Sequence, residues 1–311
     1  MPEYISNLHK LLEEDHFVVC SEMGPPIGAD PDFIREKCED LHGYVDAVNV
    51  TDNQTAIVRM SSIAASKIAH EEGLEMIIQA TTRDRNRIGL QSDLLGASAL
   101  GLRNVLCLTG DHQSFGKDEG SKNVFDMDSV SLIKAARDMV DEEELVSGDD
   151  LRTPPKLYIG GAHNPFAEPY EMHMLKLKKK INAGMDFIQT QCIYNLEKFD
   201  RWMKDMRKEG LHEEVHILAG LLPTKSEFAL KYMKNDVPGM DVPDELIDRI
   251  ANADDKRQEG IDFTVEIIEY VKNTEGVKGI HLMPVGWEEI TPVVVEEAGL
   301  YPRPEVEVDD E

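Results

Sequence analysis

Two carboxylates stand where short apolar segments of the sequence end. Glu22 closes the segment HFVVCSE, and Asp111 follows the apolar run 105–108 after Thr109 and Gly110. An apolar run bounded by glycine and polar turn residues predicts a strand that is buried on both faces, as in a parallel sheet. In parallel sheets and barrels the ligand lies at the C-terminal ends of the strands. Asp111 is therefore a candidate site residue by position, although an Asp at this place can equally cap a turn.

Further polar residues follow other predicted strands and would share that edge. They are Thr51, Asp52, Gln54, Gln79, His163, Asn164 and Gln191. No pair of His and carboxylates at helical i, i+4 spacing indicates a metal site. Lys156 begins a predicted strand instead of ending one, which argues against a Schiff-base lysine, and no His is placed to activate Cys20 as a nucleophile. These residues suit a neutral or anionic heteroaromatic ligand held by hydrogen bonds, with one or two carboxylates as proton donors.

Eight apolar segments predict the strands that would position these residues. The strands are 16–22, 47–50, 75–80, 105–108, 156–160, 187–191, 215–218 and 279–283. Amphipathic segments between them predict helices at 30–41, 59–72, 85–101, 128–140 and 169–183, around Trp202, and at 225–235, 244–252, 258–273 and 288–298. Eight strands, each followed by a helix, predict an α/β fold of the (β/α)8 TIM barrel type. An open doubly wound sheet is the alternative, but no G-x-G-x-x-G turn follows the first strand.

No linker or internal repeat divides the chain, so we expect one domain over residues 1–301 and a Pro-rich, acidic and frayed tail over residues 302–311. The net charge of −27, from 60 acidic and 33 basic residues, excludes a general nucleic-acid binder and argues against an anionic membrane surface as partner.

The N-terminal residues lack a signal-peptide pattern, and no apolar run approaches the roughly 20 residues of a membrane span. The four cysteines have no metal-ligand spacing. Cys20, Cys107 and Cys192 fall in or beside apolar strands, where a free cysteine behaves as a small buried hydrophobe. We expect a cytoplasmic protein that forms a homo-oligomer.

Several segments together resemble the methylenetetrahydrofolate reductase family, a family of flavin-containing barrels. They are Glu22 with Pro25 and Pro26, VNVTD, QATTRDRNRIGLQSDLLGASALGLRNVLCLTGD, AGMDFIQTQCIYN and AGLLP. The similarity covers nearly the whole chain in the same order and spacing. The chain resembles the short prokaryotic form, without the C-terminal regulatory domain of the animal enzymes.

The resemblance implies that reduced flavin passes a hydride to 5,10-methylenetetrahydrofolate and so forms 5-methyltetrahydrofolate. Glu22 matches the general acid that protonates the N10 side during ring opening; without the family it would be a strand-end carboxylate bonded to backbone amides. Asp111 matches the carboxylate between the flavin pyrimidine and the pterin, where it tunes the flavin and binds the folate ring. Gln191 matches a folate contact, and otherwise it is an ordinary strand-end amide.

The resemblance also implies cofactor contacts along the barrel rim. These positions are Thr51, Asp52, Gln54, Gln79, Thr109, Gly110, Asp111, Phe125, His163, Lys176, Lys179 and Lys180. Bacterial members carry His at the position of Gln79, Arg at that of Thr109 and Tyr at that of His163. The three lysines match positions near the flavin phosphate or adenosine end, although a solvated helix face would account for them equally. Phe125 could likewise be a packing residue.

The implied cofactor is FAD, with FMN as the alternative, and NADH or NADPH is a possible electron donor. The segment HLMPVGWEEITP lacks the Arg that members carry near Trp287, so a partner subunit with zinc or iron–sulfur centres is a second possible donor. Two alternative functions stay open. The protein could be a folate- or pterin-binding subunit, or a pterin-dependent methyltransferase barrel, and neither uses flavin redox chemistry.

Overall fold

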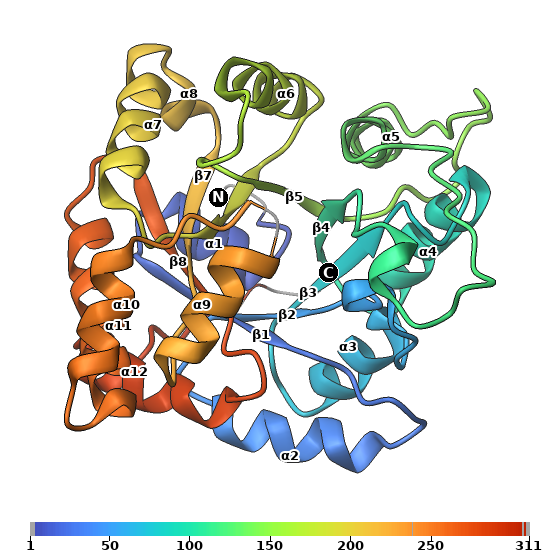
Figure 1. Ribbon diagram of the computed structural model, residues 1–311. Helices are drawn as coiled ribbons and strands as arrows, with labels where there is room; N and C mark the ends of the chain where they lie inside the picture. The colour runs from blue at the N-terminus through green and yellow to red at the C-terminus, as the bar shows by residue number, and fades with distance from the viewer. Residues whose placement is uncertain (1–3, 238, 307, 309–311) are drawn as a thin grey trace.

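The computed structural model describes residues 4–237, 239–306 and 308 of the chain. Eight parallel strands close into one barrel in the order of the sequence, with helices around it (Figure 1). The strands are β1 Val18–Met23, β2 Ala47–Val50, β3 Met76–Thr81, β4 Asn104–Leu108, β5 Tyr158–His163, β6 Phe187–Cys192, β7 His216–Leu221 and β8 Val277–Leu282. The predicted (β/α)8 barrel is confirmed.

Helices connect the strands, and polar caps decide where many of them begin. They are α1 Asn7–Glu13, α2 Pro31–Leu41, α3 Ser62–Glu71, α4 Arg87–Ala99, α5 Ser129–Asp141, α6 Tyr170–Asn182, α7 Leu196–Lys208, α8 Leu211–Glu214, α9 Glu227–Asp236, α10 Asp244–Asn252, α11 Lys256–Lys272 and α12 Thr291–Glu297, with the short 3-10 helices η1 Gln54–Ala56, η2 Gln113–Phe115 and η3 Glu288–Ile290. Helix α3 begins later than predicted because the Ser61 side chain accepts a hydrogen bond from the N–H of Ala64. That bond satisfies one of the backbone donors that a helix start leaves unpaired.

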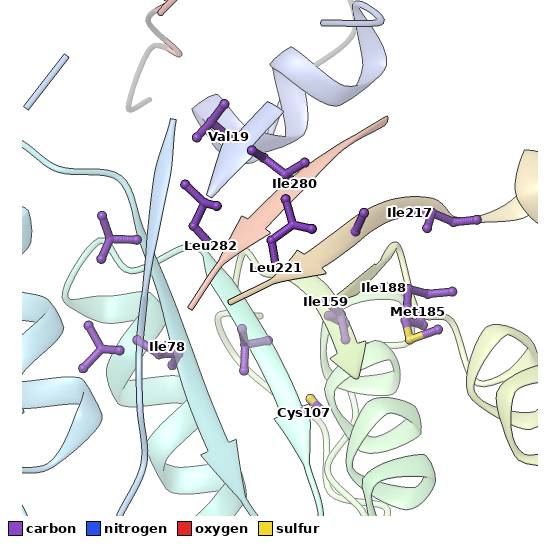
Figure 2. Packing of buried hydrophobic residues seen from close by; sticks show 14 of the residues in the cluster. Val19, Ile78, Cys107, Ile159, Met185, Ile188, Ile217, Leu221, Ile280 and Leu282 are labelled. Carbon is purple, nitrogen blue, oxygen red and sulfur yellow. The ribbon is translucent and has the colours of Figure 1, made fainter. Parts of the chain in front are cut away.

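Alternation along the strands gives the barrel an inner and an outer apolar layer. The inner layer combines helix α1 with residues from seven strands: Leu8, Leu11, Leu12, Val18, Cys20, Ala47, Ile77, Leu106, Tyr158, Phe187 and Leu218. Alternate strand residues, among them Val19, Ile78 and Ile188, belong to the larger outer layer that packs against the helices (Figure 2). Helix α1 therefore closes the N-terminal end of the barrel, and the inner layer forms its floor.

Strands β5 and β7 end later than predicted. His163 pairs with Thr190 of β6, and Leu221 pairs with Leu282 of β8. Because neighbouring strands continue to supply partners at these positions, the ladder extends past the polar and glycine residues that predicted a turn. His163 is thus the last residue of a strand, and the prediction that it lies in the following turn is wrong.

The expectation of a frayed tail is wrong for the described residues after 301. The Arg303 side chain pairs with Asp46 at 2.7 Å and donates to the backbone oxygen of Phe17 at 2.6 Å. Both charged side chains are almost fully buried, at 8% and 1% exposure. Val306 packs against the inner layer. A buried ion pair with backbone bonds therefore fixes this segment beneath the barrel; residues 307 and 309–311 of the tail lie outside the described residues.

Two composition-based expectations can be compared with the fold. All four cysteines are free and buried, which confirms Cys20, Cys107 and Cys192 as small core residues. In the described part of the chain, no helix combines the length and the apolar character needed to cross a membrane.

Candidate active site at the C-terminal mouth of the barrel

A layer of polar side chains lies above the apolar floor, one step nearer the C-terminal ends of the strands. Each member follows an inward-facing strand residue by two positions, and the period of two keeps it on the inner face. The members are Glu22 on β1, Asn49 on β2, Gln79 on β3, Gln189 on β6 and His281 on β8. The sequence thus changes from apolar to polar inside the barrel at the level where a ligand would enter.

Glu22 is held at this level by its neighbours in the layer. The Gln79 side-chain amide donates to Glu22 Oε2 at 3.0 Å, and His281 Nε2 lies 3.8 Å from the same oxygen. The Glu22 side chain keeps 11% exposure, so it is shielded but still reachable from the mouth. A carboxyl oriented in this way can exchange a proton with a bound ligand.

Asn49 and Gln189 join opposite parts of the layer. Asn49 Nδ2 donates to Gln189 Oε1 at 2.7 Å, and Gln189 Nε2 donates back to Asn49 Oδ1 at 2.9 Å. Both side chains are buried, so each amide would be costly to leave unpaired. The reciprocal pair therefore makes a rigid polar base beneath the mouth, which the sequence analysis did not identify.

The Asp52 carboxylate lies within the protein and binds neighbouring loops. Its Oδ2 accepts hydrogen bonds from the backbone N–H and the hydroxyl of Thr81, at 2.8 and 2.9 Å, and it pairs with the Arg85 guanidinium. Only 3% of the side chain is exposed. The structure therefore gives Asp52 a role in joining the end of β2 to the loop after β3, and it supplies no direct support for the predicted flavin contact.

Arg83, which the sequence analysis did not single out, ties three rim loops together. Its guanidinium donates to the backbone oxygens of Asn53 at 3.0 Å and of Asp111 at 3.3 Å, and it pairs with Asp84 at 2.7 Å. The hydrogen bond to Asp84 raises the pKa of this guanidinium, and 2% of the side chain is exposed. A buried cation with several oxygen partners holds the loops after β2, β3 and β4 as one wall.

Asp111 projects from this wall and is exposed. Gly110 precedes it with a φ of +83°, and a Cβ there would lie 3.1 Å from the Thr81 Cβ, so the turn requires glycine. Asp111 Oδ2 accepts from the Thr55 backbone N–H at 3.2 Å. Thr109 bonds through its hydroxyl to Ser129 at the start of α5. Of these residues, Asp111 presents a carboxylate that a ligand can reach.

Thr51 and Gln54 take different positions after β2. Thr51 is 1% exposed, and its hydroxyl oxygen has no hydrogen-bond partner in the described structure. Gln54 begins η1 and is exposed. A buried hydroxyl without a partner is unfavourable unless a ligand or water satisfies it, so the Thr51 environment agrees with a ligand contact.

His163 faces away from the inside of the barrel. Its ring stacks on Trp202 of α7, with 5.5 Å between ring centroids and an interplanar angle of 25°. Burial, with a smaller effect of Lys180, lowers the pKa of His163 to about 3, so the ring is neutral at physiological pH. This environment is that of a packed core histidine, and the predicted flavin contact stays a prediction without support from the geometry.

The three lysines of α6 divide between core and surface. Lys180 is buried and donates to the backbone oxygen of Ala162, and burial followed by repulsion from Lys176 lowers its pKa to about 8. Lys176 and Lys179 are exposed. Lys180 is therefore committed to a protein partner, whereas the two exposed lysines stay available to an anionic group.

Gln191 and Phe125 stand at other parts of the rim. Gln191 lies on β6 where the register with β7 shifts, and its Oε1 accepts from the Cys192 N–H at 3.0 Å. Phe125 is 38% exposed with a positive φ of 40°. The preceding residue, Val124, donates its N–H to the Arg83 oxygen at 2.7 Å. Phe125 is thus carried by the same wall as Asp111.

Exposed apolar side chains gather in the segments that follow the strands. Phe228 and Tyr232 on α9 are 78% and 53% exposed, while Leu230 between them is buried beside the end of β6. Ile27, Val58 and Val285, from the segments after β1, β2 and β8, are more than half exposed. Aromatic and aliphatic groups of this kind suit a flat ring system. The sequence does not reveal the exposure of Ile27, Val58 and Val285, because a hydrophobic residue in a loop belongs to no periodic pattern.

His281 was also missed, although a signal for it exists. It follows Gly279 by two residues within the strand predicted at 279–283, so period-two alternation places both on one face. No set of three or more His, Cys, Asp or Glu side chains among the described residues is arranged to hold a metal ion. The layer therefore offers hydrogen bonds and proton transfer through Glu22 and His281.

Comparison with families and curated proteins gives one consistent description. A family model described as methylenetetrahydrofolate reductase matches residues 7–299. The chain is 24% identical to a probable methylenetetrahydrofolate reductase (NADPH) of Caenorhabditis elegans, over 96% of this chain and 45% of the relative. It is 22% identical to the 5,10-methylenetetrahydrofolate reductase of Salmonella typhimurium, over 76% of this chain and 74% of the relative. The chain thus spans less than half the length of the nematode relative.

Solved structures show the same architecture. A Clostridium thermocellum protein described as binding two copies of 5-methyl-5,6,7,8-tetrahydrofolic acid aligns with a TM-score of 0.66 and 16% identity, over 94% of this chain and 98% of that chain. EDTA monooxygenase from Chelativorans sp. BNC1 aligns with a TM-score of 0.57 and 11% identity, over 94% and 96% of the two chains. At these identities the likeness shows the barrel fold.

Proposed function

Because the chain belongs to the methylenetetrahydrofolate reductase family, we propose that it reduces 5,10-methylenetetrahydrofolate to 5-methyltetrahydrofolate at the C-terminal mouth of its barrel. The observation that carries the proposal is the position of Glu22, a shielded carboxyl that Gln79 orients at the ligand end of the barrel. The tetrahydrofolate ligand of the Clostridium thermocellum protein supports the same class of substrate, since that protein shares the fold.

The chemistry explains why this reaction needs an acid. The methylene carbon of the substrate bridges N5 and N10, and it accepts a hydride only after the bond to N10 breaks and leaves an iminium at N5. Glu22 donates a proton to N10 as that bond breaks. General acids in such positions contribute about 10²- to 10⁴-fold to rate. Gln79 keeps the carboxyl in place through its hydrogen bond to Oε2.

We propose FAD, with FMN as the alternative, as the cofactor of this site. A bound reduced flavin supplies the hydride. The residues present fit a flat heteroaromatic ring, because the unpartnered Thr51 hydroxyl can bind it and the wall around Arg83 presents Asp111 and Phe125. The exposed Lys176 and Lys179 would bind phosphate or adenosine groups, whereas Lys180 is already bound to Ala162.

Asp111 and Gln191 are proposed as substrate contacts. Asp111 carries an exposed carboxylate beside Gly110, which can accept N–H donors of a pterin ring. Gln191 is half-buried on β6, at a position where an amide can bind the folate. NADH, NADPH or an electron-donating partner subunit with zinc or iron–sulfur centres would reduce the cofactor.

Replacing Glu22 tests the proposal. E22Q keeps the size and the bond partner of the side chain but removes the proton. We expect the reoxidation of reduced flavin by 5,10-methylenetetrahydrofolate to slow about 10²- to 10⁴-fold, while reduction of the flavin by its donor stays unchanged. Both steps are followed by flavin absorbance in anaerobic stopped flow. E142Q, at an exposed position at the end of α5, is the matched control.

Three outcomes would contradict the proposal. Purified protein without flavin absorbance would favour a pterin-binding subunit or a methyltransferase barrel. Equal loss of both half-reactions in E22Q would point to a structural role for Glu22. An unchanged folate-dependent step in E22Q would remove Glu22 from the mechanism.

A further inference from the structure

Besides Glu22, the polar layer contains one other ionisable side chain, that of His281. We propose that His281 is a positioning residue for Glu22, which orients its carboxyl and returns a proton to it after each turnover. This inference rests on the proposed function, because it concerns the same proton donor.

The contact between the two side chains comes from the closure of the barrel. Strand β8 pairs with β1, and His281 is in register with Cys20, so its ring stands beside Glu22 two residues further along. His281 Nε2 lies 3.8 Å from Glu22 Oε2, with 4% and 11% of the two side chains exposed. This distance exceeds a direct hydrogen bond. A small rotation of either side chain would bring the two atoms within hydrogen-bond distance, and a bridging water molecule could also connect them.

The second nitrogen of His281 is uncommitted. Nδ1 is buried and has no hydrogen-bond partner in the described structure. An unpaired buried polar atom is costly, and such atoms concentrate where a catalytic contact is made. A histidine whose two nitrogens were both bound to backbone would be held in one tautomer. Here one nitrogen faces Glu22 and the other is free to take up a proton.

The other groups that face this pair do not supply the proton. Gln79 on β3 is neutral and serves as a donor to Oε2. Burial raises the pKa of the Cys192 thiol on β6 and of the Cys20 thiol on β1 well above the usual range, so both stay protonated at neutral pH. Gly220, the register partner of His281 on β7, has no side chain. Imidazole is the side chain that exchanges protons near neutral pH.

The proton balance of one turnover then closes. Glu22 gives its proton to N10, the bond between N10 and the methylene carbon breaks with its electrons on N10, and the iminium carbon accepts the hydride from the reduced cofactor of the proposed function. Glu22 is left as a carboxylate. The His281 ring takes up a proton at Nδ1 from a bound water molecule that exchanges with solvent, and the imidazolium so formed passes its Nε2 proton to Oε2 and becomes neutral again.

H281Q tests this role, because glutamine keeps an N–H donor near the position of Nε2 but cannot carry a proton. We expect the folate-dependent reoxidation of the reduced protein to slow about 100-fold, at the lower end for proton-transfer groups. The pH dependence of this step should differ from that of the wild type, and added imidazole should restore part of the rate. Donor-dependent reduction should not change. H216Q, with His216 at the opposite end of the barrel against Glu13, is the matched control.

A structural role would give a different result. If H281Q slows the reaction but keeps the wild-type pH profile and gains nothing from imidazole, His281 is a packing residue and the inference is wrong. Wild-type rates in H281Q also overturn it. If H281Q fails to fold, H281N serves with the same three measurements. A wild-type protein that is not reoxidised by 5,10-methylenetetrahydrofolate would instead disprove the proposed function.

Discussion

A substitution at Asp52 can show whether this residue contacts the cofactor or stabilises the fold, because the family resemblance implies the first role and the geometry indicates the second. The resemblance implies that it touches the flavin, whereas its Oδ2 is occupied by the N–H and hydroxyl of Thr81 and by the Arg85 guanidinium. The perturbation is D52N, which keeps the size of the side chain and removes its charge. If the geometry is decisive, the variant loses stability in the flavin-free protein.

The contacts set the size of the loss. Hydrogen bonds to a charged group contribute about 1.5–3 kcal/mol each, and the amide keeps one acceptor oxygen. Arg85 retains its second partner, Asp93, at 2.8 Å, so no cation is left unpaired. We expect the free energy of unfolding to fall by about 2–4 kcal/mol. At about 2.1 cal/mol/K per residue, 311 residues give an unfolding entropy near 0.65 kcal/mol/K, so Tm falls by about 3–6 °C.

The assay is thermal unfolding of flavin-free protein by circular dichroism, with flavin affinity measured separately by titration. D32N is the control, since Asp32 forms a 2.7 Å pair with Arg35 but is 78% exposed. Exposed pairs contribute about 0.2–1 kcal/mol, so its Tm should move by less than about 2 °C. The reasoning is refuted if D52N keeps the wild-type Tm and its flavin affinity drops more than about tenfold.

Two further predictions concern stability. R303M leaves Asp46 buried without its cation, so the free energy of unfolding should fall by about 3–5 kcal/mol and Tm by about 5–8 °C. Calorimetry measures this change. A shift in Tm below about 1 °C would show that the segment after residue 301 is not anchored in solution. The pKa of His163 is lowered from 6.5 to about 3, so the unfolded chain binds the proton more strongly. The contribution of neutral His163 to the free energy of unfolding is fully present above pH 6.5. It is lost as the pH falls toward 3, by up to about 1.4 kcal/mol per pH unit. H163F should remove this part of the slope in denaturant unfolding at pH 7 to 4, and parallel curves for both proteins would contradict it.

The barrel was predictable because its signals are local. Short apolar runs separated by amphipathic segments repeat eight times, and buried parallel strands need such runs to fill both faces. Glu22 and Asp111 could be placed at the ligand end for the same reason, since a carboxylate that follows a strand of a parallel barrel must lie at its C-terminal mouth. The family motifs in the segments around these residues agree with the family match.

The direction of each side chain was decided by the tertiary structure. Asp52 and His163 also stand at strand ends in the sequence, but the first bonds to the next loop and the second stacks on a helix. The strand before His163 was predicted to end at residue 160 but ends at His163, and one residue of difference reverses the face of a side chain. Strand β2 ends where it was predicted to end, but the direction of Asp52 depends on Thr81 and Arg85, which lie about 30 residues further along the chain. Ring closure then brings β8 beside β1 and places His281 against Glu22. The sequence alone determined that polar groups meet at one mouth of the barrel. Which of these groups lie next to one another was decided by strand register and barrel closure, since both depend on hydrogen bonds between strands far apart in the chain.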